Sequence, residues 1–336
     1  MAQDAEVLAF VQAAAELLRQ RLEVAEVTVD LEKRQILINE ALEDCLGTLS
    51  KTGFWSEENR LLSSTLWNAV GDRLEKGWLQ ARARLKPRGY AGDHELLRRI
   101  VDRELCEHPF GRCFDRYFQA QAAPQAVRNR FELAAGWIVD AVHRTNAAIC
   151  RISSVGSGPA IDISLACSQL PPEQRSRLHV TLLDVDGEAL DSAAERLSRH
   201  LAADQMTLVQ CNVFRLAQRP TLAEHLQGSE VILCTGLFDY LTDTAAAEML
   251  SEFWNRLAPG GTAYVFNFAP HNPTRAYMEW LGNWYLLYRS EAELKAIAHA
   301  AGIPGDRTTS GAEPLGIDLY LALNKLDSAE GLIKPG

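Results

Sequence analysis

The sequence of 336 residues lacks the marks of several large protein classes. Its seven cysteines are odd in number and no two form a CxxC motif, which argues against a disulfide framework or a zinc site and favours a reducing, cytoplasmic compartment. Its histidines form no HxxxH pair and no cluster with cysteine, so no metal is expected. No apolar run approaches the roughly 18–20 residues that a membrane-spanning helix needs.

Positive charge is also scarce. Lys and Arg number 34 against 44 Asp and Glu, for a net charge of −10 at pH 7, so a nucleic-acid backbone is not an expected partner. Arg82, Arg84 and Arg88 are a local exception, which we interpret as a solvated helix face. The first residues lack the basic region and apolar core of a signal peptide. The length and the 47% hydrophobic content suit two globular domains, and the oligomeric state stays open.

Apolar residues recur at helical spacing in the first 125 residues. Each such set must bury one helical face. The spacing predicts three long amphipathic helices followed by two shorter ones, at residues 7–22, 38–49, 62–78, 93–105 and 110–121. We therefore predict an all-α domain over residues 1–125 that acts as a lid on the remainder of the chain, residues 126–336.

Beyond residue 125, strand-like apolar runs alternate with helical segments. The runs occupy residues 151–155, 180–184, 206–214, 230–236, 262–267 and 317–323. Thr242 can cap a helix over 243–257, a Pro-Gly-Gly turn follows at 259–261, and Ser290 with Glu293 has capping-box spacing. This order predicts an α/β, Rossmann-like, doubly wound and mostly parallel sheet, in which ligands bind at the carboxyl ends of the strands.

The first of these runs ends in a glycine turn, Val155-Gly-Ser-Gly-Pro-Ala160, that opens into a helix. Glycines let the backbone approach a ligand, and Asp184 at the end of the second run can hold both hydroxyls of a ribose. A dinucleotide fingerprint needs a third small residue at the place where Ile161 stands. We therefore predict S-adenosylmethionine (SAM), which carries no pyrophosphate, as the cofactor.

This order resembles the class I SAM-dependent methyltransferases over residues 125–325, most specifically at 155–160, Asp184 and 257–261. A narrower resemblance covers nearly the whole chain. It is to a bacterial family with a helical N-terminal part that includes enzymes making 3-hydroxy fatty acid methyl esters, and it is carried by residues 86–93, 127–130, 155–160 and 284–289. That family usually has Cys where Ser157 stands, which weakens the assignment to any one subfamily.

Side chains at the expected strand ends are the candidate cofactor contacts. Asn212 is placed to meet the adenine amine, an aromatic ring such as Tyr240 can lie over the sulfonium, and Arg130 can grip the methionine carboxylate. Asn212 could also be a plain turn residue. The full predicted set is Arg130, Gly156, Ser157, Gly158, Asp184, Val185, Asn212, Val213, Thr235, Gly236 and Tyr240.

Three further residues are candidates for catalysis. Tyr90 and Asp93 share one loop, and His271 follows the fifth predicted strand, where it could act as a general base. Each has a plainer interpretation: Asp93 as a helix cap, Tyr90 as a packing residue and His271 as a loop residue without a role. The acceptor pocket is expected from residues 238–241 and 271–289, which follow strand ends.

Two reactions of SAM fit this set, and the residues do not separate them. Methyl transfer to a small molecule is one. A carboxylate acceptor, such as that of a hydroxy or fatty acid, is ionised at pH 7 and needs no base, which suits a chain without an obvious catalytic pair. Cyclisation of SAM itself, to methylthioadenosine and azetidine-2-carboxylate, is the alternative, and some relatives resembling this family perform it. A non-catalytic SAM-binding module is a third.

Overall fold

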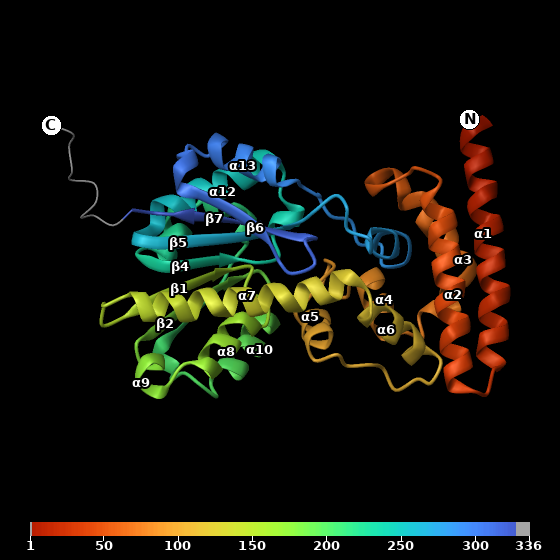
Figure 1. Ribbon diagram of the computed structural model, residues 1–336, viewed down its shortest axis with the longest axis horizontal. Helices are drawn as coiled ribbons and strands as arrows, with labels where there is room; N and C mark the ends of the chain where they lie inside the picture. Colours follow the sequence, from red (N-terminus) through yellow and green to blue (C-terminus); the bar gives the residue numbers. More distant parts are fainter. Residues whose placement is uncertain (1, 327–336) are drawn as a thin grey trace. The chain divides into compact units, whose positions relative to one another are not determined.

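The computed structural model describes residues 2–326. They form two compact units (Figure 1). Unit 1 contains the described residues through Gln125 together with Asn272–Leu286. Unit 2 contains Ala126–His271 and the described residues from Leu287 onward. The predicted helical domain of residues 1–125 did not include the 272–286 segment, which packs with the N-terminal helices.

Unit 1 is built from helices. α1 packs against both α2 and α3, as Figure 1 shows, and α4 packs against α6. Most of the apolar residues whose helical spacing predicted α1 and α2 are buried. A π-helix at Tyr277–Leu281 packs on α3. The α-helices are α1 (Ala2–Val27), α2 (Leu31–Ser50), α3 (Arg60–Leu74), α4 (Trp78–Leu85), α5 (His94–Val101) and α6 (Gly111–Gln119).

Two expectations for unit 1 were wrong. The third predicted helix does not run to Trp78, because α3 ends at Leu74 and Gly77 precedes a separate helix, α4. Nor do Arg82 and Arg84 form a solvated face. Arg82 Nε donates to Asp93 at 2.8 Å, and Arg84 Nη1 donates to Ser63 Oγ at 2.8 Å, so both guanidinium groups are tied to neighbouring elements.

Unit 2 alternates strands and helices as predicted. α7 begins at the end of unit 1 and runs into unit 2, and a 3-10 helix covers Val213–Gln218. The regular elements are α7 (Ala122–Arg144), β1 (Cys150–Val155), α8 (Ile161–Gln169), α9 (Pro172–Arg175), β2 (Leu178–Asp184), α10 (Gly187–Leu197), β3 (Met206–Gln210), α11 (Pro220–Ala223), β4 (Ser229–Cys234), α12 (Asp243–Arg256), β5 (Leu257–Phe268), α13 (Glu291–Ala300), β6 (Thr308–Ala312) and β7 (Asp318–Asn324).

The strands form one seven-stranded sheet in the order β3-β2-β1-β4-β5-β7-β6. The first five strands are parallel, and β7 pairs antiparallel with both β5 and β6. The strand order reverses beside β1, between β2 and β4, so the carboxyl ends of these strands meet at one edge. The predicted Rossmann-like, doubly wound sheet is confirmed.

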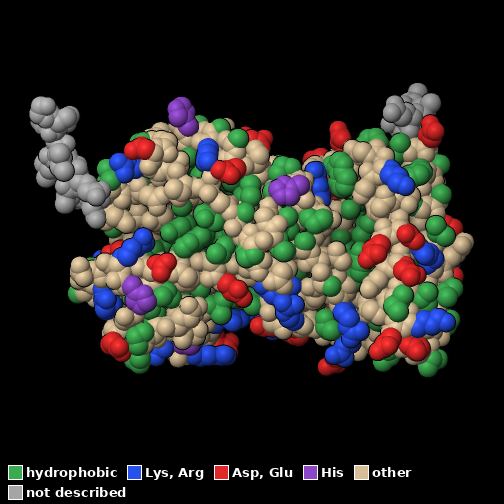
Figure 2. All heavy atoms as spheres, viewed as in Figure 1, with side chains coloured by type: hydrophobic (Ala, Val, Ile, Leu, Met, Phe, Trp, Pro, Cys, Tyr) green, Lys and Arg blue, Asp and Glu red, His purple; other side chains and the backbone are tan. Residues whose placement is uncertain are grey.

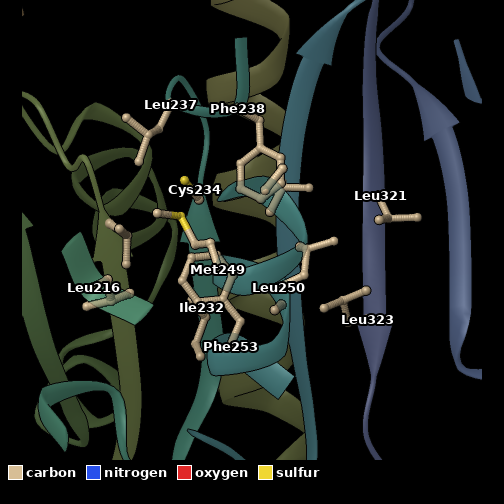
Figure 3. Close-up of a cluster of buried hydrophobic side chains, with 14 of the residues drawn as sticks. Leu216, Ile232, Cys234, Leu237, Phe238, Met249, Leu250, Phe253, Leu321 and Leu323 are labelled. Carbon is tan, nitrogen blue, oxygen red and sulfur yellow. The ribbon is translucent and has the colours of Figure 1, made fainter. Parts of the chain in front are cut away.

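Both faces of the sheet are covered by apolar layers. Successive strand residues point to opposite faces, so in β4 Ile232 and Cys234 pack toward α12 and α13, while Val231 and Leu233 pack toward α7, α8 and α10. Figure 3 shows the first of these clusters, with Phe238, Met249 and Phe253 among its labelled side chains. A sheet buried on both faces explains why its strands read as nearly continuous apolar runs.

Helix ends follow the predicted signals more closely than strand ends do. The Thr242 side chain accepts from Ala245 N at 3.3 Å, and Ser290 and Glu293 form the reciprocal capping box. The expected turn at 259–261 is absent as a separate element, because β5 continues through it with a register shift against β4. The third predicted strand was also too long, since β3 ends at Gln210.

The exterior carries no dominant charge of one sign on the face seen in Figure 2, where acidic and basic side chains are interspersed. All seven cysteines are free, and five of them are buried. Over residues 2–326, no helix combines the length and the apolar composition that crossing a bilayer requires.

Candidate functional site

The glycine turn after β1 has an unusual backbone. Gly156 and Gly158 have φ of 64° and 51°, and Ala160, the N-cap of α8, has φ of 48°. A buried alanine in the left-handed region is costly and marks a conformation held by its surroundings. Gly156 N and Ser157 N both donate to Leu183 O, at 2.8 and 3.2 Å, which fastens the turn to β2. The Ser157 hydroxyl is buried and makes no hydrogen bond with any described residue.

Asp184 lies at the carboxyl end of β2 and closes the other side of this turn. Its Oδ2 accepts from Gly158 N at 2.8 Å and its Oδ1 accepts from Asp186 N at 3.0 Å. Burial raises the pKa of the carboxyl group, and these two N–H groups oppose that rise. A carboxylate has about four acceptor positions, so two remain for a ligand that offers a pair of hydroxyls.

The residues after β2 and β3 present apolar surface beside Asp184. Val185, a predicted contact, is 47% exposed. Asn212 caps the 3-10 helix at Val213–Gln218, with its Oδ1 accepting from Phe214 N at 3.1 Å. The Val213 side chain points into the core, whereas Phe214 is 47% exposed. Phe214, which was not among the predicted contacts, is the side chain of this pair that faces solvent.

Arg130, predicted as a contact to the methionine carboxylate, turns inward. Its side chain on α7 is 5% exposed, and its Nη1 donates to Asp318 Oδ2 at 3.1 Å. A Cβ added to Gly236 would lie 3.4 Å from Arg130 Nη2, so Gly236 leaves room for the guanidinium just past the end of β4. Arg130 Nε and Asp318 Oδ1 are both buried and unpartnered among the described residues. Arg128, on the same helix, is also buried.

Three buried carboxyl groups surround Arg130, and we call Asp162, Asp239 and Asp318 the acidic cluster. Burial raises the pKa of Asp162 and that of Asp239 to about 6, and it raises the pKa of Asp318 well above its ordinary value. In each case the positive charge of Arg130 opposes the rise without cancelling it. The Arg289 guanidinium opposes the rise at Asp239 as well.

The segment after β4 is fixed by a second arginine. Arg289 Nη1 donates to Phe238 O at 2.8 Å and to Asn267 Oδ1 at 2.7 Å. Asp239 Oδ1 accepts from Phe268 N at 2.8 Å, which joins the segment to the end of β5. Phe238 is fully buried in the core (Figure 3), so its side chain cannot line the acceptor pocket that we expected there. Thr235 is buried and Tyr240 is half-buried.

The three predicted catalytic residues fall in different places. Asp93 and Tyr90 belong to unit 1, and His271 belongs to unit 2. The Asp93 carboxylate is engaged twice, as the N-cap of α5 through Leu96 N at 2.9 Å and in an ion pair with Arg82. His271 is exposed, and its Nε2 lies 2.9 Å from Gly316 O. Tyr90 is half-buried.

Sequence reasoning also missed two members of the acidic cluster, Asp239 and Asp318. Their positions carried a partial signal, since Asp239 follows β4 and Asp318 begins β7, opposite Phe268 at the end of β5. No motif linked them to Arg130, which is 188 positions from Asp318 along the chain. Among residues 2–326, no three His, Cys, Asp or Glu side chains are grouped as a metal site would require.

Solved structures share this fold. They include a possible exported protein from Bordetella parapertussis, 19% identical with a TM-score of 0.56 over 95% of this chain and 97% of that one. The CurJ carbon methyltransferase is 13% identical, with a TM-score of 0.53 over 97% and 94%. The CMeT domain of the citrinin polyketide synthase is 13% identical, with a TM-score of 0.51 over 85% and 78%. No family model matches the sequence, and no curated protein matches it significantly.

Proposed function

We propose that this chain is a SAM-dependent methyltransferase that acts on a small molecule, a carboxylic acid such as a hydroxy or fatty acid. The observation that carries the proposal is the pairing of the Gly156–Ala160 turn with Asp184, which is joined to Gly158 N at 2.8 Å at the reversal of strand order. Such a pair suits the ribose of a nucleoside cofactor. One of the solved structures with this fold bears the name carbon methyltransferase.

The amino-acid end of SAM fits the surroundings of Arg130. The guanidinium is a donor for the methionine carboxylate, and the acidic cluster supplies negative charge for the ammonium and the sulfonium. The unpartnered Nε of Arg130 and Oδ1 of Asp318 support this placement, because buried polar atoms are rarely left without a partner unless a ligand or water supplies it. Phe214 and Val185 supply apolar surface for the adenine.

Methyl transfer is an in-line displacement, in which the acceptor oxygen bonds to the methyl carbon as its bond to sulfur breaks. The protein chiefly aligns the two reactants and excludes water. A carboxylate acceptor needs no general base. A hydroxyl acceptor would need one, and the candidates are His271, Tyr90 and Asp93. We propose that the helical unit acts as a lid in this reaction. We also propose that the enzyme works in the cytoplasm.

The acidic cluster favours one second candidate, cyclisation of SAM. In that reaction the α-amine attacks its own γ-carbon, the bond between that carbon and sulfur breaks, and methylthioadenosine leaves with the electron pair. The ammonium must first lose a proton. A carboxyl group with a pKa of about 6, such as that of Asp239, is a suitable acceptor beside Arg130.

Mass analysis of the products tests both candidates. The purified protein is incubated with SAM alone and then with SAM and a 3-hydroxy fatty acid. Methyl transfer predicts no turnover of SAM alone and release of adenosylhomocysteine with the methyl ester once the acid is added. Methylthioadenosine with azetidine-2-carboxylate from SAM alone would identify the cyclase instead. SAM binding without either product, across a panel of acids and alcohols, would leave a binding module.

A further inference from the structure

Unit 1 gathers basic side chains in a chain that is acidic overall. Arg60, Arg84 and Lys86, which we call the basic cluster, lie close enough for the charges of both arginines to act on the Lys86 ammonium. Glu57 is the one carboxylate among the described residues that pairs with any of the three, and it lies 2.7 Å from Arg60 with a side chain that is 73% exposed. The excess charge is positive, against a net charge of −10 for the whole chain.

Arg84 is held in place by neutral groups. Its Nη1 donates to Ser63 Oγ at 2.8 Å, and its Nη2 donates to Ser63 O at 3.2 Å. The carbonyl oxygens of Trp280 and Leu281 lie 3.4 Å from Nη1, and the guanidinium stacks over Trp67 with its centre 4.5 Å from the ring. Burial lowers the pKa of Arg84 to about 10. These contacts fix the guanidinium without neutralising it.

Lys86 is positioned by a strained turn. It ends α4 with φ of 48°, its N–H donates to Arg82 O at 2.9 Å, and its carbonyl accepts from Gly89 N at 2.7 Å. A residue with a Cβ in this conformation costs of order 1 kcal/mol or more and marks an imposed geometry. The half-buried ammonium has no hydrogen bond or ion pair with any described residue. Burial and the charges of Arg60 and Arg84 lower its pKa, and Glu57 opposes them.

Tyr285 lies beside the basic cluster. The Arg60 guanidinium lies 5.2 Å from the centre of its ring. The phenol hydroxyl is buried beside Ser63 and makes no well-formed hydrogen bond with a described residue. Arginine and lysine can only donate, and a phenol donates readily, whereas the carboxylates that act here are the exposed Glu57, on Lys86, and, on Tyr285, Glu279, which is paired with Arg275. A ligand that satisfies them has to be an acceptor with negative charge.

We propose that the basic cluster and Tyr285 form a binding site for an oxyanion, the carboxylate or phosphate group of a small molecule. A planar guanidinium and a mobile ammonium suit such a group, and charge-assisted hydrogen bonds to it are stronger than neutral ones. A bound anion also relieves the repulsion among the three cations. The site goes beyond the proposed function and does not rest on it, because anion binding requires neither SAM nor turnover.

Lysine-specific NMR on the full-length protein tests the site. The chain has only seven lysines, and dimethylation with 13C-labelled methyl groups keeps their charge. The Lys86 signal is assigned by its loss in Lys86→Met. Inorganic phosphate and butyrate are titrated in separate arms at constant ionic strength. We expect a saturable shift at Lys86 and a rise in its pKa in at least one arm, and the responding arm identifies phosphate or carboxylate as the ligand group.

Calorimetry with the responding anion measures the contributions of the side chains. Lys86→Met and Arg60→Met should each weaken binding at least tenfold, whereas Lys51→Met, an exposed lysine of the same unit, should bind as the unmodified protein does. If Lys86→Met fails to fold, Lys86→Gln replaces it, and the titration of the Lys86 signal in the protein without substitutions still tests whether the anion binds there. Shifts that do not saturate with either anion, or that are equal at all lysines, would show screening alone and overturn the proposal.

Discussion

The two units group ionisable side chains of opposite kinds, buried carboxyl groups in unit 2 and partly exposed basic groups in unit 1. In unit 2 three carboxyl groups surround Arg130, whereas in unit 1 the exposed Glu57 pairs with Arg60 and acts on Lys86, and Arg84 contacts neutral groups. The net charge of −10 predicts neither arrangement. Charge excess held by packing is a local property, and each cluster is complementary to a different ligand charge. The acidic cluster suits the cationic end of SAM, and the basic cluster suits an oxyanion.

The largest expected effect comes from removing the cation of the acidic cluster. Arg130→Met leaves Asp318 buried without its 3.1 Å partner, which should lower the free energy of unfolding by about 3–5 kcal/mol. Urea unfolding at pH 7 measures the loss. Arg151→Met, at an exposed arginine of β1, is the control and should change little. A double variant with Asp318→Asn should recover much of the loss, and no recovery would mean that the two side chains do not act as a pair.

Replacing Asp184 tests whether SAM and the oxyanion bind at separate sites. Asp184→Ala should weaken SAM binding by about 1–3 kcal/mol, because the ribose hydroxyls lose a charged acceptor. The same variant should bind phosphate or butyrate at the basic cluster as the unmodified protein does. Calorimetry with each ligand provides both values, and Asp191→Ala, an exposed acid on α10, controls for lost charge. Unchanged SAM affinity in Asp184→Ala would remove the basis of the cofactor assignment.

The acidic cluster also has a pH signature. The folded pKa of Asp162, about 6, lies above its ordinary value of 3.8, so the folded state binds more protons between these values. The contribution of Asp162 to the free energy of unfolding is therefore fully present below about pH 4. It is lost as the pH rises through about 6, and the loss is on the order of 1–3 kcal/mol. Asp162→Asn cannot ionise and should reduce the slope of this part of the urea-unfolding profile, to which Asp239 also contributes. Asp191→Asn should keep the slope of the unmodified protein.

The sequence predicted the parts of the site that are local in the chain. The glycine turn and Asp184 each end a strand, so a motif of a few residues placed them at one sheet edge. Arg130 and Asp318 meet only after the sheet has formed, and no local pattern joins positions so far apart. The exposed position of Phe214 was not predicted, because the chain leaves β3 at Gln210 and a 3-10 helix sets which side chain points inward.

In unit 1 as well, the sequence predicted local elements but not the contacts between distant segments. Helical periodicity found α1 and α2, but it treated the arginines of α4 as solvated, because a pattern of charges does not reveal what packs against it. The contacts of Arg84 with Ser63, Trp280 and Leu281 come from α3 and from a segment nearly 200 positions later. The basic cluster is therefore a product of tertiary structure.

The smallest expected effect tests the basic cluster through stability. The folded pKa of Lys86 is lowered, so the unfolded state binds more protons between the folded value and 10.5. Lys86 therefore costs stability at neutral pH, and this cost disappears as the pH rises toward 10.5. Because the ammonium is half exposed and screened, Lys86→Met should raise the free energy of unfolding by only about a few tenths of a kcal/mol at pH 7 and low salt. Urea unfolding at low and high salt measures the gain, which should shrink with salt, and Lys51→Met should show none. A loss of stability in Lys86→Met would mean that the ammonium is already paired, and the contrast between the two units would fail at that point.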